Sequence, residues 1–397
     1  MILSDVCEFI VDCPHSTAPD EGKGYPLIRT PNVGKGRLDL NGVHRVSESV
    51  YKQRIQRGAP RANDLIFARE APAGNVALVQ ENQTVCLGQR TVLIRPNVQK
   101  VNPQYLVYYL LSPKPQYELL GTANGATVAH VNLPAIRNLK IELPEKSVQD
   151  KIGTILVNYD DLIENNQRQI KLLEEAAQRL YKEWFVDLRF PGHENTKIVD
   201  GVPEGWQYEK LGDLVKTTSG GTPSRRKSEY YVNGNIRWIK TKELNDRFIF
   251  ETEEHITEDA VKNSSAKVLP EGALIVAMYG ATIGKIGITA AEMACNQACC
   301  AFVSFDDMIS KEYLYCWLMD NREYLVSQGK GAAQSNLSQE MIRNFSLLCP
   351  DKKVIKNFTE IVTTMLENKR ALENKILMLS KARDDLLPKL MSGEVEV

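Results

Sequence analysis

The chain of 397 residues repeats itself, and this repetition constrains its fold more than any single motif does. Seven short segments of the first half recur in the same order in the second half. Partners lie between 206 residues (Ile136 and Ile342) and 211 residues (Leu27 and Trp238) apart. The pairs are Leu3-Ser-Asp-Val6 with Leu211-Gly-Asp-Leu214, Leu27-Ile-Arg-Thr30 with Trp238-Ile-Lys-Thr241, Leu65-Ile-Phe-Ala68 with Leu274-Ile-Val-Ala277, Gly74-Asn-Val76 with Gly284-Lys-Ile286, Gln89 with Gln297, Tyr105-Leu-Val-Tyr-Tyr-Leu110 with Tyr313-Leu-Tyr-Cys-Trp-Leu318, and Ile136-Arg-Asn138 with Ile342-Arg-Asn344. Because chance does not supply seven collinear pairs, the sequence predicts a duplicated unit.

Both copies have the composition of folded proteins, since 43% of the residues are hydrophobic and 25% are charged. Their apolar residues form short alternations broken by Gly, Pro and Asn, and only residues 105–119 and 312–328 show a helical pattern. This favours mixed α/β domains with a β-rich body, in the α+β class. The length also exceeds what a single hydrophobic core usually supports. We therefore expect two similar domains.

Features of membrane, secreted and metal-binding proteins are weak. No basic segment precedes an apolar stretch at the N-terminus, so we expect a cytoplasmic protein with no secretory signal. The most membrane-like window, residues 273–291, is interrupted by Gly280, Gly284 and Gly287, which indicates strand, loop and strand. The eight cysteines form no C-x-x-C pair, so reduced, mostly buried thiols and no metal site are expected.

Each copy ends in a segment with apolar residues at helical a/d spacing, and each seam contains an asparagine. A polar residue in such a seam fixes the register of two paired helices. The seam residues expected to pair the helices are Ile163, Asn166, Ile170, Leu173, Leu180 and Trp184 in the first segment, and Met365, Asn368, Leu372, Leu379 and Leu386 in the second. The outer face of the first helix is charged and is expected to face solvent or a partner; it carries Glu164, Arg168, Lys171, Glu174, Glu175, Arg179 and Lys182.

These patterns predict a pseudo-twofold arrangement in which two long antiparallel coiled-coil helices join the two domains. The first helix is stopped by Pro191 and Gly192. The expected segments are a first domain at 1–145, a central helical region at 146–190, a linker at 191–208, a second domain at 209–349 and a C-terminal helical region at 350–397.

A near-neutral net charge of −1 hides two basic stretches. Residues 21–69 contain ten basic and four acidic residues, a balance of +6, and residues 220–247 contain seven and three, a balance of +4. The stretches occupy equivalent places in the repeat. A single charged stretch is usually a solvated face, but its recurrence in a duplicated unit favours contact with nucleic-acid phosphates.

Signatures of catalysis are missing. Gly280-Ala-Thr-Ile-Gly284 has three residues between its glycines where a P-loop needs four, and Ile286 stands where a Ser or Thr would bind magnesium. The chain has no Pro-Pro dipeptide and so lacks the motif with which adenine methyltransferases hold a flipped base. The cysteines at 295, 299 and 300 lack a fourth zinc ligand at a suitable spacing. We expect a chain that is not an enzyme.

The order of domain, helix, domain and helix resembles that of the specificity (S) subunits of type I restriction-modification systems over essentially the whole chain. The segments that carry the resemblance are Trp184-Phe-Val-Asp-Leu-Arg-Phe-Pro-Gly192, Leu211-Gly-Asp213, Trp238-Ile-Lys-Thr241, Gly280-Ala-Thr-Ile-Gly-Lys285 and Gly331-Ala-Ala-Gln-Ser-Asn-Leu337. The resemblance implies that each domain is a target-recognition domain that reads one half of a bipartite, asymmetric DNA sequence. The helices would set the spacing and dock two methylation subunits.

The resemblance also implies where the cofactors lie. S-adenosylmethionine, ATP and magnesium would be bound by the methylation (M) and restriction (R) subunits, and none by this chain. Double-stranded DNA would be its ligand, and no membrane would be involved.

Loop positions near DNA are likewise implied by the resemblance. In the first domain they are Arg29, Thr30, Arg69, Glu70, Asn75, Gln89, Thr127 and His130, and in the second Lys240, Thr241, Lys242, Tyr279, Thr282, Lys285, Gln297, Gln334, Ser335 and Asn336, with Arg225 and Arg226 on phosphates. For the basic positions Arg29, Lys240 and Lys285, a surface charge beside a strand is an equally good interpretation. The equivalent loops differ in sequence, so the two half-sites are expected to differ as well.

Two other classes remain open from the residues alone. A non-catalytic coiled-coil scaffold whose two heads bind peptides or glycans would show no salt-sensitive DNA binding. An enzyme would need a group of titratable residues that five scattered histidines and unpaired carboxylates do not supply.

Overall fold

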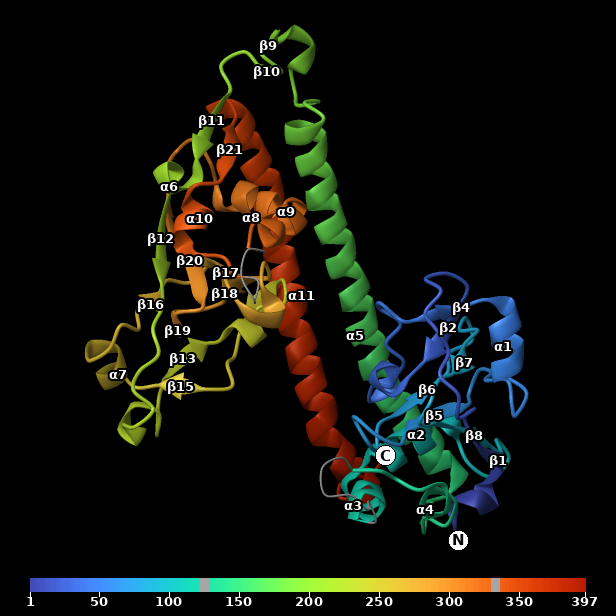
Figure 1. Ribbon diagram of the computed structural model, residues 1–397. Helices are drawn as coiled ribbons and strands as arrows, with labels where there is room; N and C mark the ends of the chain where they lie inside the picture. The colour runs from blue at the N-terminus through green and yellow to red at the C-terminus, as the bar shows by residue number, and fades with distance from the viewer. Residues whose placement is uncertain (122–128, 330–335) are drawn as a thin grey trace. The chain divides into compact units, whose positions relative to one another are not determined.

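A computed structural model describes residues 1–121, 129–329 and 336–397, and Figure 1 shows its helices and strands. The chain forms two compact units. Unit 1 consists of Met1–Glu164 and Leu377–Val397, and unit 2 of Asn165–Ile376. Each unit thus contains one copy of the repeat together with part of both long helices. No helix in the described ranges is long and apolar enough to cross a membrane.

Unit 1 is built on a five-stranded sheet with the order β1-β8-β5-β6-β3. Its strands are β1 (Cys7–Asp12), β8 (Thr91–Pro96), β5 (Leu65–Ala68), β6 (Val76–Leu78) and β3 (Gly36–Arg37). All neighbours are antiparallel except β3 and β6, which are parallel. Successive residues of β5 enter different hydrophobic clusters, Leu65 and Phe67 on one side and Ile66 and Ala68 on the other. Both faces of the sheet are therefore covered, which explains why its central strands are continuously apolar.

A three-stranded sheet and several helices complete the first copy. The small sheet has the order β4-β2-β7. Asn102 caps the buried helix α2 by accepting hydrogen bonds from the backbone N–H groups of Gln104 (2.7 Å) and Tyr105 (3.1 Å). The elements are η1 (Leu3–Val6), β2 (Tyr25–Ile28), η2 (Thr30–Asn32), β4 (Arg45–Val46), α1 (Glu48–Arg54), β7 (Cys86–Leu87), α2 (Pro103–Leu111), α3 (Pro113–Gly121) and α4 (Leu133–Arg137).

Unit 2 repeats this plan. Its large sheet has the order β12-β20-β17-β18-β14, and its small sheet has the order β15-β13-β19-β16. The elements of these sheets and the segments between them are α6 (Leu211–Leu214), β12 (Val215–Ser219), η5 (Ser228–Tyr230), β13 (Ile236–Ile239), η6 (Thr241–Glu243), β14 (Arg247–Ile249), β15 (His255–Ile256), α7 (Glu258–Lys262), β16 (Val268–Leu269), β17 (Leu274–Ala277), η7 (Gly280–Thr282), β18 (Ile286–Thr289), β19 (Met293–Cys295), β20 (Cys299–Phe305), α8 (Lys311–Asp320), α9 (Arg322–Gln328) and α10 (Gln339–Arg343).

The two large sheets match strand for strand, so that β1, β8, β5, β6 and β3 correspond to β12, β20, β17, β18 and β14. The parallel pair also recurs, because β14 runs parallel to β18 as β3 does to β6. The predicted duplication and the mixed α/β fold with a β-rich body are confirmed. Unit 2 adds a connecting segment with η4 (His193–Asn195), β9 (Ile198–Val199) and β10 (Val202–Pro203), and a ribbon of β11 (Gln207–Lys210) and β21 (Ser346–Cys349).

The two long helices are α5 (Lys146–Tyr181), which continues into the π-helical segment η3 (Lys182–Val186), and α11 (Lys352–Ser392). Within unit 2 they run antiparallel: Trp184 packs on Phe358 with ring centroids 5.9 Å apart, whereas Glu174, earlier on α5, pairs with Lys369, later on α11. Within unit 1, Asp160 of α5 pairs with Arg383 of α11.

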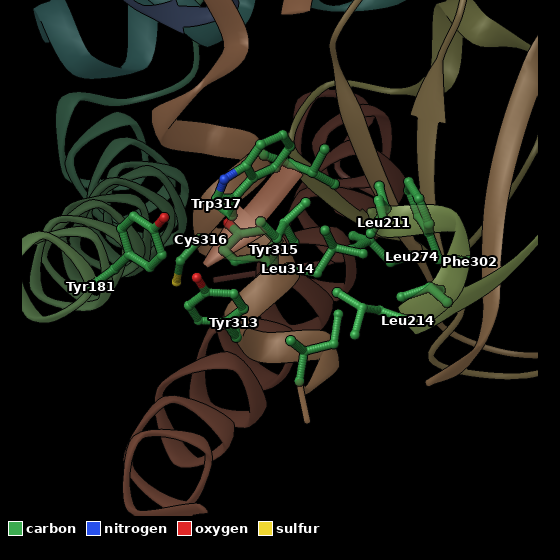
Figure 2. Close-up of a cluster of buried hydrophobic side chains, with 14 of the residues drawn as sticks. Tyr181, Leu211, Leu214, Leu274, Phe302, Tyr313, Leu314, Tyr315, Cys316 and Trp317 are labelled. Carbon is green, nitrogen blue, oxygen red and sulfur yellow. The ribbon is translucent and has the colours of Figure 1, made fainter. Parts of the chain in front are cut away.

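An aromatic cluster joins these helices to the body of unit 2. Tyr181 of α5 lies beside Tyr313 of α8, as Figure 2 shows, with ring centroids 5.6 Å apart. Phe185 and Phe358 pack edge to face at 4.9 Å. The same cluster continues into the large sheet through Leu274 and Phe302. The helices are therefore part of the hydrophobic core of the unit.

The buried face of the helices differs from the predicted seam. Ile170, Trp184 and Asn166 are buried, as a seam requires. On α11 the prediction for Asn368 is wrong, because this residue is exposed and the neighbouring Lys369 is 1% exposed. The other predicted seam residues are only half-buried: Ile163, Leu173, Leu180, Met365, Leu372, Leu379 and Leu386. A helix that packs on a domain as well as on another helix buries a wider stripe than an a/d seam.

Candidate nucleic-acid interface

In unit 1, the predicted loop residues lie on segments that are close together. Arg69 and Glu70 directly follow β5, Gln89 lies between β7 and β8, and His130 precedes α4. The hydroxyl of Thr30, in η2, donates to the backbone oxygen of Ala71 at 3.3 Å. Backbone hydrogen bonds from Arg69 N–H to Arg90 (2.9 Å) and from Val131 N–H to Arg69 (3.0 Å) hold these loops against one another.

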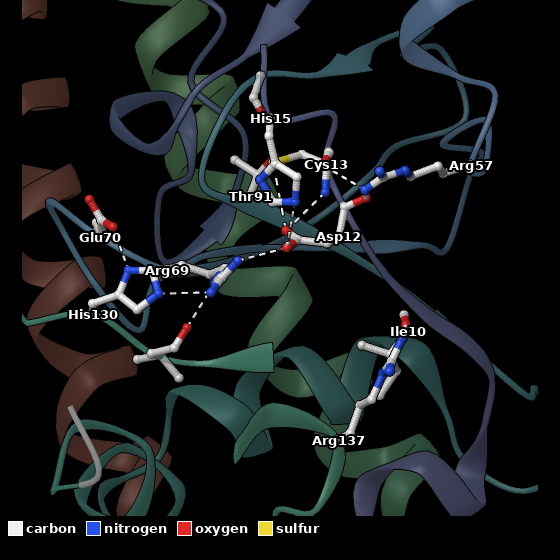
Figure 3. A network of polar contacts seen from close by, with 12 residues as sticks. Ile10, Asp12, Cys13, His15, Arg57, Arg69, Glu70, Thr91, His130 and Arg137 are labelled. Carbon is white, nitrogen blue, oxygen red and sulfur yellow. Dashed lines mark hydrogen bonds and ion pairs between the residues drawn. The ribbon is translucent and has the colours of Figure 1, made fainter. Parts of the chain in front are cut away.

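A polar network occupies the place where these loops meet (Figure 3). Arg69 donates from Nη1 to the Asp12 carboxylate at 2.8 Å, from Nε to the Val131 backbone oxygen at 2.8 Å, and from Nη2 to His130 Nε2 at 2.7 Å. His130 in turn contacts the Glu70 carboxylate through Nδ1. Glu70 also pairs with Arg90 at 2.7 Å.

The network assigns a tautomer to His130. Because a guanidinium can only donate, Nε2 of His130 accepts from Arg69, and the ring proton lies on Nδ1, where it is donated to Glu70. Arg69 is enclosed, with a side chain only 11% exposed, and each of its three nitrogens has a partner within the chain. The exposed parts of the network include His130 and Arg90, whose side chain is 63% exposed. Arg69 thus holds the surrounding side chains in place, and the polar groups of His130 and Arg90 are accessible to solvent.

Other predicted residues of unit 1 have structural partners. Asn75 donates from Nδ2 to the backbone oxygen of Val33 at 2.8 Å, and Gln89 donates from Nε2 to that of His15 at 2.8 Å. Arg29 is half-buried against Gly88. Thr127 lies outside the described residues.

Unit 2 has the same backbone framework at the equivalent place. Met278 N–H bonds to Ala298 at 2.9 Å and Leu337 N–H bonds to Met278 at 2.9 Å, which repeats the two bonds made by Arg69 in unit 1. By these bonds, Tyr279 corresponds to Glu70 and Asn336 to His130. The two copies therefore carry different side chains on loops that share the same backbone hydrogen bonds.

The equivalent side chains in unit 2 are neutral. We call Thr222, Tyr279, Gln297 and Asn336 the rim of unit 2. Thr222 and Gln297 are hydrogen-bonded through their side chains at 2.5 Å, and the Tyr279 hydroxyl lies 3.4 Å from the Gln297 backbone oxygen. Tyr279 and Asn336 form an isolated β-bridge. Hydroxyl and amide groups of this kind donate to and accept from base edges.

Three further predicted positions lie near the rim: Thr282 is in η7, which follows Tyr279, and Thr241 and Lys242 are in η6, which lies against η7. Gln334 and Ser335 lie outside the described residues.

Most of the basic residues predicted in unit 2 are paired with carboxylates. Arg225 contacts Glu254 at 2.6 Å and lies over the Tyr231 ring at 4.3 Å. Lys240 contacts Glu254 at 2.5 Å and Glu253 at 3.0 Å, and Lys242 also pairs with Glu253. These lysines lower the pKa of Glu253 to about 2. Lys285 pairs with Asp246 at 2.8 Å, while Arg226 is exposed.

Sequence reasoning did not identify several members of these sites. Asp12, Arg90 and Thr222 take part in the two loop clusters, and Glu253 and Glu254 neutralise the predicted basic residues. Arg90 could have been found, because it directly follows the predicted Gln89. The pairing of Asp12 with Arg69 spans 57 positions and has no local signal.

Among the described residues, no group of three His, Cys, Asp or Glu side chains is arranged to hold a metal ion. All eight cysteines are unpaired and only Cys7 is more than marginally accessible, as expected for reduced thiols. Burial raises the pKa of the Cys86 thiol to about 11, which leaves it protonated and unreactive at neutral pH.

Comparisons with known proteins agree with this architecture. The sequence matches the family described as type I restriction modification DNA specificity domain over residues 1–175 and again over 203–378. It is 28% identical to the Type I restriction enzyme MjaIX specificity subunit of Methanocaldococcus jannaschii over 363 residues, covering 90% of this chain and 83% of that protein. It is 25% identical to the Type I restriction enzyme HindI specificity subunit of Haemophilus influenzae, covering 85% and 87%.

A solved structure shows the same fold. The crystal structure of the type I restriction-modification system S subunit from M. genitalium has a TM-score of 0.61 to this chain at 14% sequence identity, covering 98% of this chain and 95% of the other. The two family matches coincide with the two structural copies, and the resemblance found in the sequence is confirmed. The chain is therefore a member of the type I restriction modification DNA specificity domain family.

Proposed function

We propose that this chain is the non-catalytic, DNA-reading specificity subunit of a type I restriction-modification complex, in which each unit reads one half of a bipartite, asymmetric target. The observation that carries the proposal is the recurrence of one loop framework with different side chains. Loop side chains on a fixed framework can distinguish base edges, whereas the framework itself contributes no sequence information.

The chemistry of the two loop clusters supports different half-sites. In unit 1, the guanidinium of Arg90 can donate to guanine and the carboxylate of Glu70 can accept from a base amino group. In unit 2, Gln297 and Asn336 carry amides of the kind that bind the donor and acceptor edge of adenine. We therefore propose that the predicted residues His130, Tyr279, Gln297 and Asn336 face the bases, together with Arg90, which the sequence did not identify.

The partners follow from the family. We expect two methylation subunits to dock on the helices and to carry S-adenosylmethionine, with restriction subunits supplying the ATP- and magnesium-dependent steps. This chain would select the DNA site, and the long helices would set the spacing between the two half-sites.

The test is to co-express the chain with its methylation subunit and to map N6-methyladenine across the host genome. The proposal expects methylation at one split motif with a fixed spacer. Exchanging residues 1–145 for those of another family member should change one half of that motif and leave the other half as it was. A stable complex that leaves the genome unmethylated, or an exchange that alters both halves, would contradict the proposal.

Point variants refine the assignment. His130→Ala should relax only the half assigned to unit 1, and Gln297→Ala only the half assigned to unit 2, each by about 1–3 kcal/mol of discrimination. Gln207→Ala, an exposed position on β11, is the matched control and should leave the motif unchanged. If Gln297→Ala and Gln207→Ala behave alike, Gln297 does not read DNA.

A further inference from the structure

Asp246 is the centre of a partly buried network in unit 2. Its side chain is 15% exposed. The carboxylate accepts from Lys285 at 2.8 Å, from the Ile286 backbone N–H at 3.1 Å, and from both terminal nitrogens of Arg322 at 2.5 and 3.1 Å. Burial alone would raise the pKa of Asp246, but these donors outweigh it and lower the pKa below its usual value. The carboxylate is therefore charged at neutral pH and fully engaged.

The backbone of Asp246 connects this network to the long helices. Its carbonyl oxygen accepts from Lys369 Nζ at 2.6 Å, and the same ammonium contacts Glu174 of α5 at 2.6 Å and the Tyr315 hydroxyl at 3.2 Å. Burial disfavours the charged form of Lys369, but Tyr315, Glu174 and Glu373 outweigh it and raise its pKa. Lys369 of α11 thus links α5 and α8 to the edge of the sheet.

Two neighbouring side chains of α11 contact the same edge. Glu373 accepts from the backbone N–H of Phe248, in β14, at 2.8 Å, and Arg370 donates to the backbone oxygen of Ala290 at 2.9 Å. Together with Lys369, these contacts go to main-chain atoms of the domain. They fix the orientation of the sheet edge whatever side chains the domain carries.

On its other side, the network holds the segment that carries the rim. Lys285 ends the loop that begins at Tyr279 and contains η7, and Ile286 is the first residue of β18. Arg322 donates from Nε to the Gly284 backbone oxygen at 3.1 Å, and Gly284, with φ +76°, packs closely against Val326. The C-terminal end of this loop therefore depends on the groups that Asp246 brings together.

We infer that Asp246 is a positioning residue for DNA recognition by unit 2, because it ties the loop bearing Tyr279 and Thr282 to the α5–α11 helix pair. This inference rests on the proposed function. A loop displaced by about 1 Å no longer meets base edges at hydrogen-bond distance. The unit 1 network uses other residues, with Arg37 and Asp161 paired at its edge strand, so a defect at Asp246 should reach only one half-site.

Asp246→Asn tests the inference with little change of shape. Asn keeps the size of the side chain and tolerates the left-handed backbone of this position, where φ is 68°. The matched control is Asp200→Asn, an exposed aspartate of the β9–β10 turn with φ 51°. The complete complex with its methylation subunits is assayed on duplexes that carry the wild-type motif or a single base change in either half.

We expect Asp246→Asn to reduce discrimination in the unit 2 half by roughly two- to thirty-fold and to leave the unit 1 half unchanged. Arg322→Met breaks the same network from α9, should have the same effect, and serves if the first variant does not assemble. The double variant should be no worse than the stronger single variant, since both act through one network.

Three results would overturn the inference. Discrimination could stay at the wild-type level, it could fall equally in both halves, or methylation of every duplex could slow equally while discrimination is preserved; the last would show a structural role only. If the wild-type complex methylates no defined motif, the proposed function fails and this inference fails with it. A normal wild-type motif with unchanged Asp246→Asn discrimination would refute the inference alone.

Discussion

Phe358→Ala should destabilise unit 2 more than any surface change on the long helices. Phe358 is fully buried and packs against Phe185 at 4.9 Å, Trp184 at 5.9 Å and Tyr313 at 6.4 Å. Removing a buried Phe side chain costs about 3–5 kcal/mol when the cavity does not collapse. The lost aromatic pairs, worth about 0.5–1.5 kcal/mol each, favour the upper end of that range.

The tryptophans provide a selective assay. All four of them, at positions 184, 206, 238 and 317, belong to unit 2, so intrinsic tryptophan fluorescence follows the unfolding of that unit. With a urea slope of about 3 kcal/mol per M for a unit of this size, a loss of about 3–5 kcal/mol lowers the unfolding midpoint by about 1–1.7 M.

Leu172→Ala is the control for Phe358→Ala, because Leu172 lies on α5 of the same unit and is 64% exposed. Its midpoint should stay within about 0.2 M of the parent, corresponding to about 0.5 kcal/mol. Equal midpoints for Phe358→Ala and Leu172→Ala would refute the view that the helices are part of the core of unit 2.

Three further predictions follow from charged groups. Arg383→Met leaves the buried Asp160 carboxylate without its cation and should destabilise unit 1 by about 3 kcal/mol in calorimetry, whereas the exposed Lys381→Met should not. The double variant Glu253→Gln/Glu254→Gln frees Arg225, Lys240 and Lys242 from their carboxylate partners. Its non-specific binding to duplex DNA should be tighter and more salt-dependent than that of the control double variant Glu229→Gln/Glu258→Gln. Equal binding by the two double variants would contradict the pairing. Burial raises the pKa of Glu373 to about 7. The stability that this group contributes to unit 2 is therefore fully present below its unfolded pKa near 4.5 and is lost as the pH rises through 7. Glu373→Gln should make the urea midpoint vary less between pH 5 and pH 8, and an unchanged pH profile would count against this prediction.

The repeat allowed the fold to be predicted, but it did not show which face of α11 is buried. Apolar spacing identified Ile170 and Trp184, because side chains of this kind have few stable places outside a core. It could not identify Lys369 or Glu373, since both are buried by contacts with backbone atoms of Asp246 and Phe248, more than a hundred residues away. The sequence gives no sign that the backbone of a distant strand edge will provide a hydrogen-bond partner for a buried charged side chain.

The predicted loop positions remain a prediction, but the structure shows which of their segments meet and which side chains are already engaged. Segments after β5 and β17 meet the segments before α4 and α10. Arg69, however, is engaged by Asp12 and His130. The basic stretch at 220–247 ends just before Glu251, Glu253 and Glu254; including them reduces the balance from +4 to +1. Net charge over a sequence window therefore misjudged how much positive charge the folded surface offers.

In unit 2, the contacts that hold the fold together differ from the rim side chains that we propose to contact DNA. The loops are joined by main-chain hydrogen bonds such as the one from Met278 to Ala298. Side chains of α11 form hydrogen bonds to main-chain atoms of Asp246, Phe248 and Ala290. None of these bonds depends on which side chains stand at the rim. Substitutions at Tyr279 or Gln297, which under the proposed function would alter the target, should therefore leave the free energy of unfolding nearly constant, because the apolar clusters and backbone contacts that supply it are left intact.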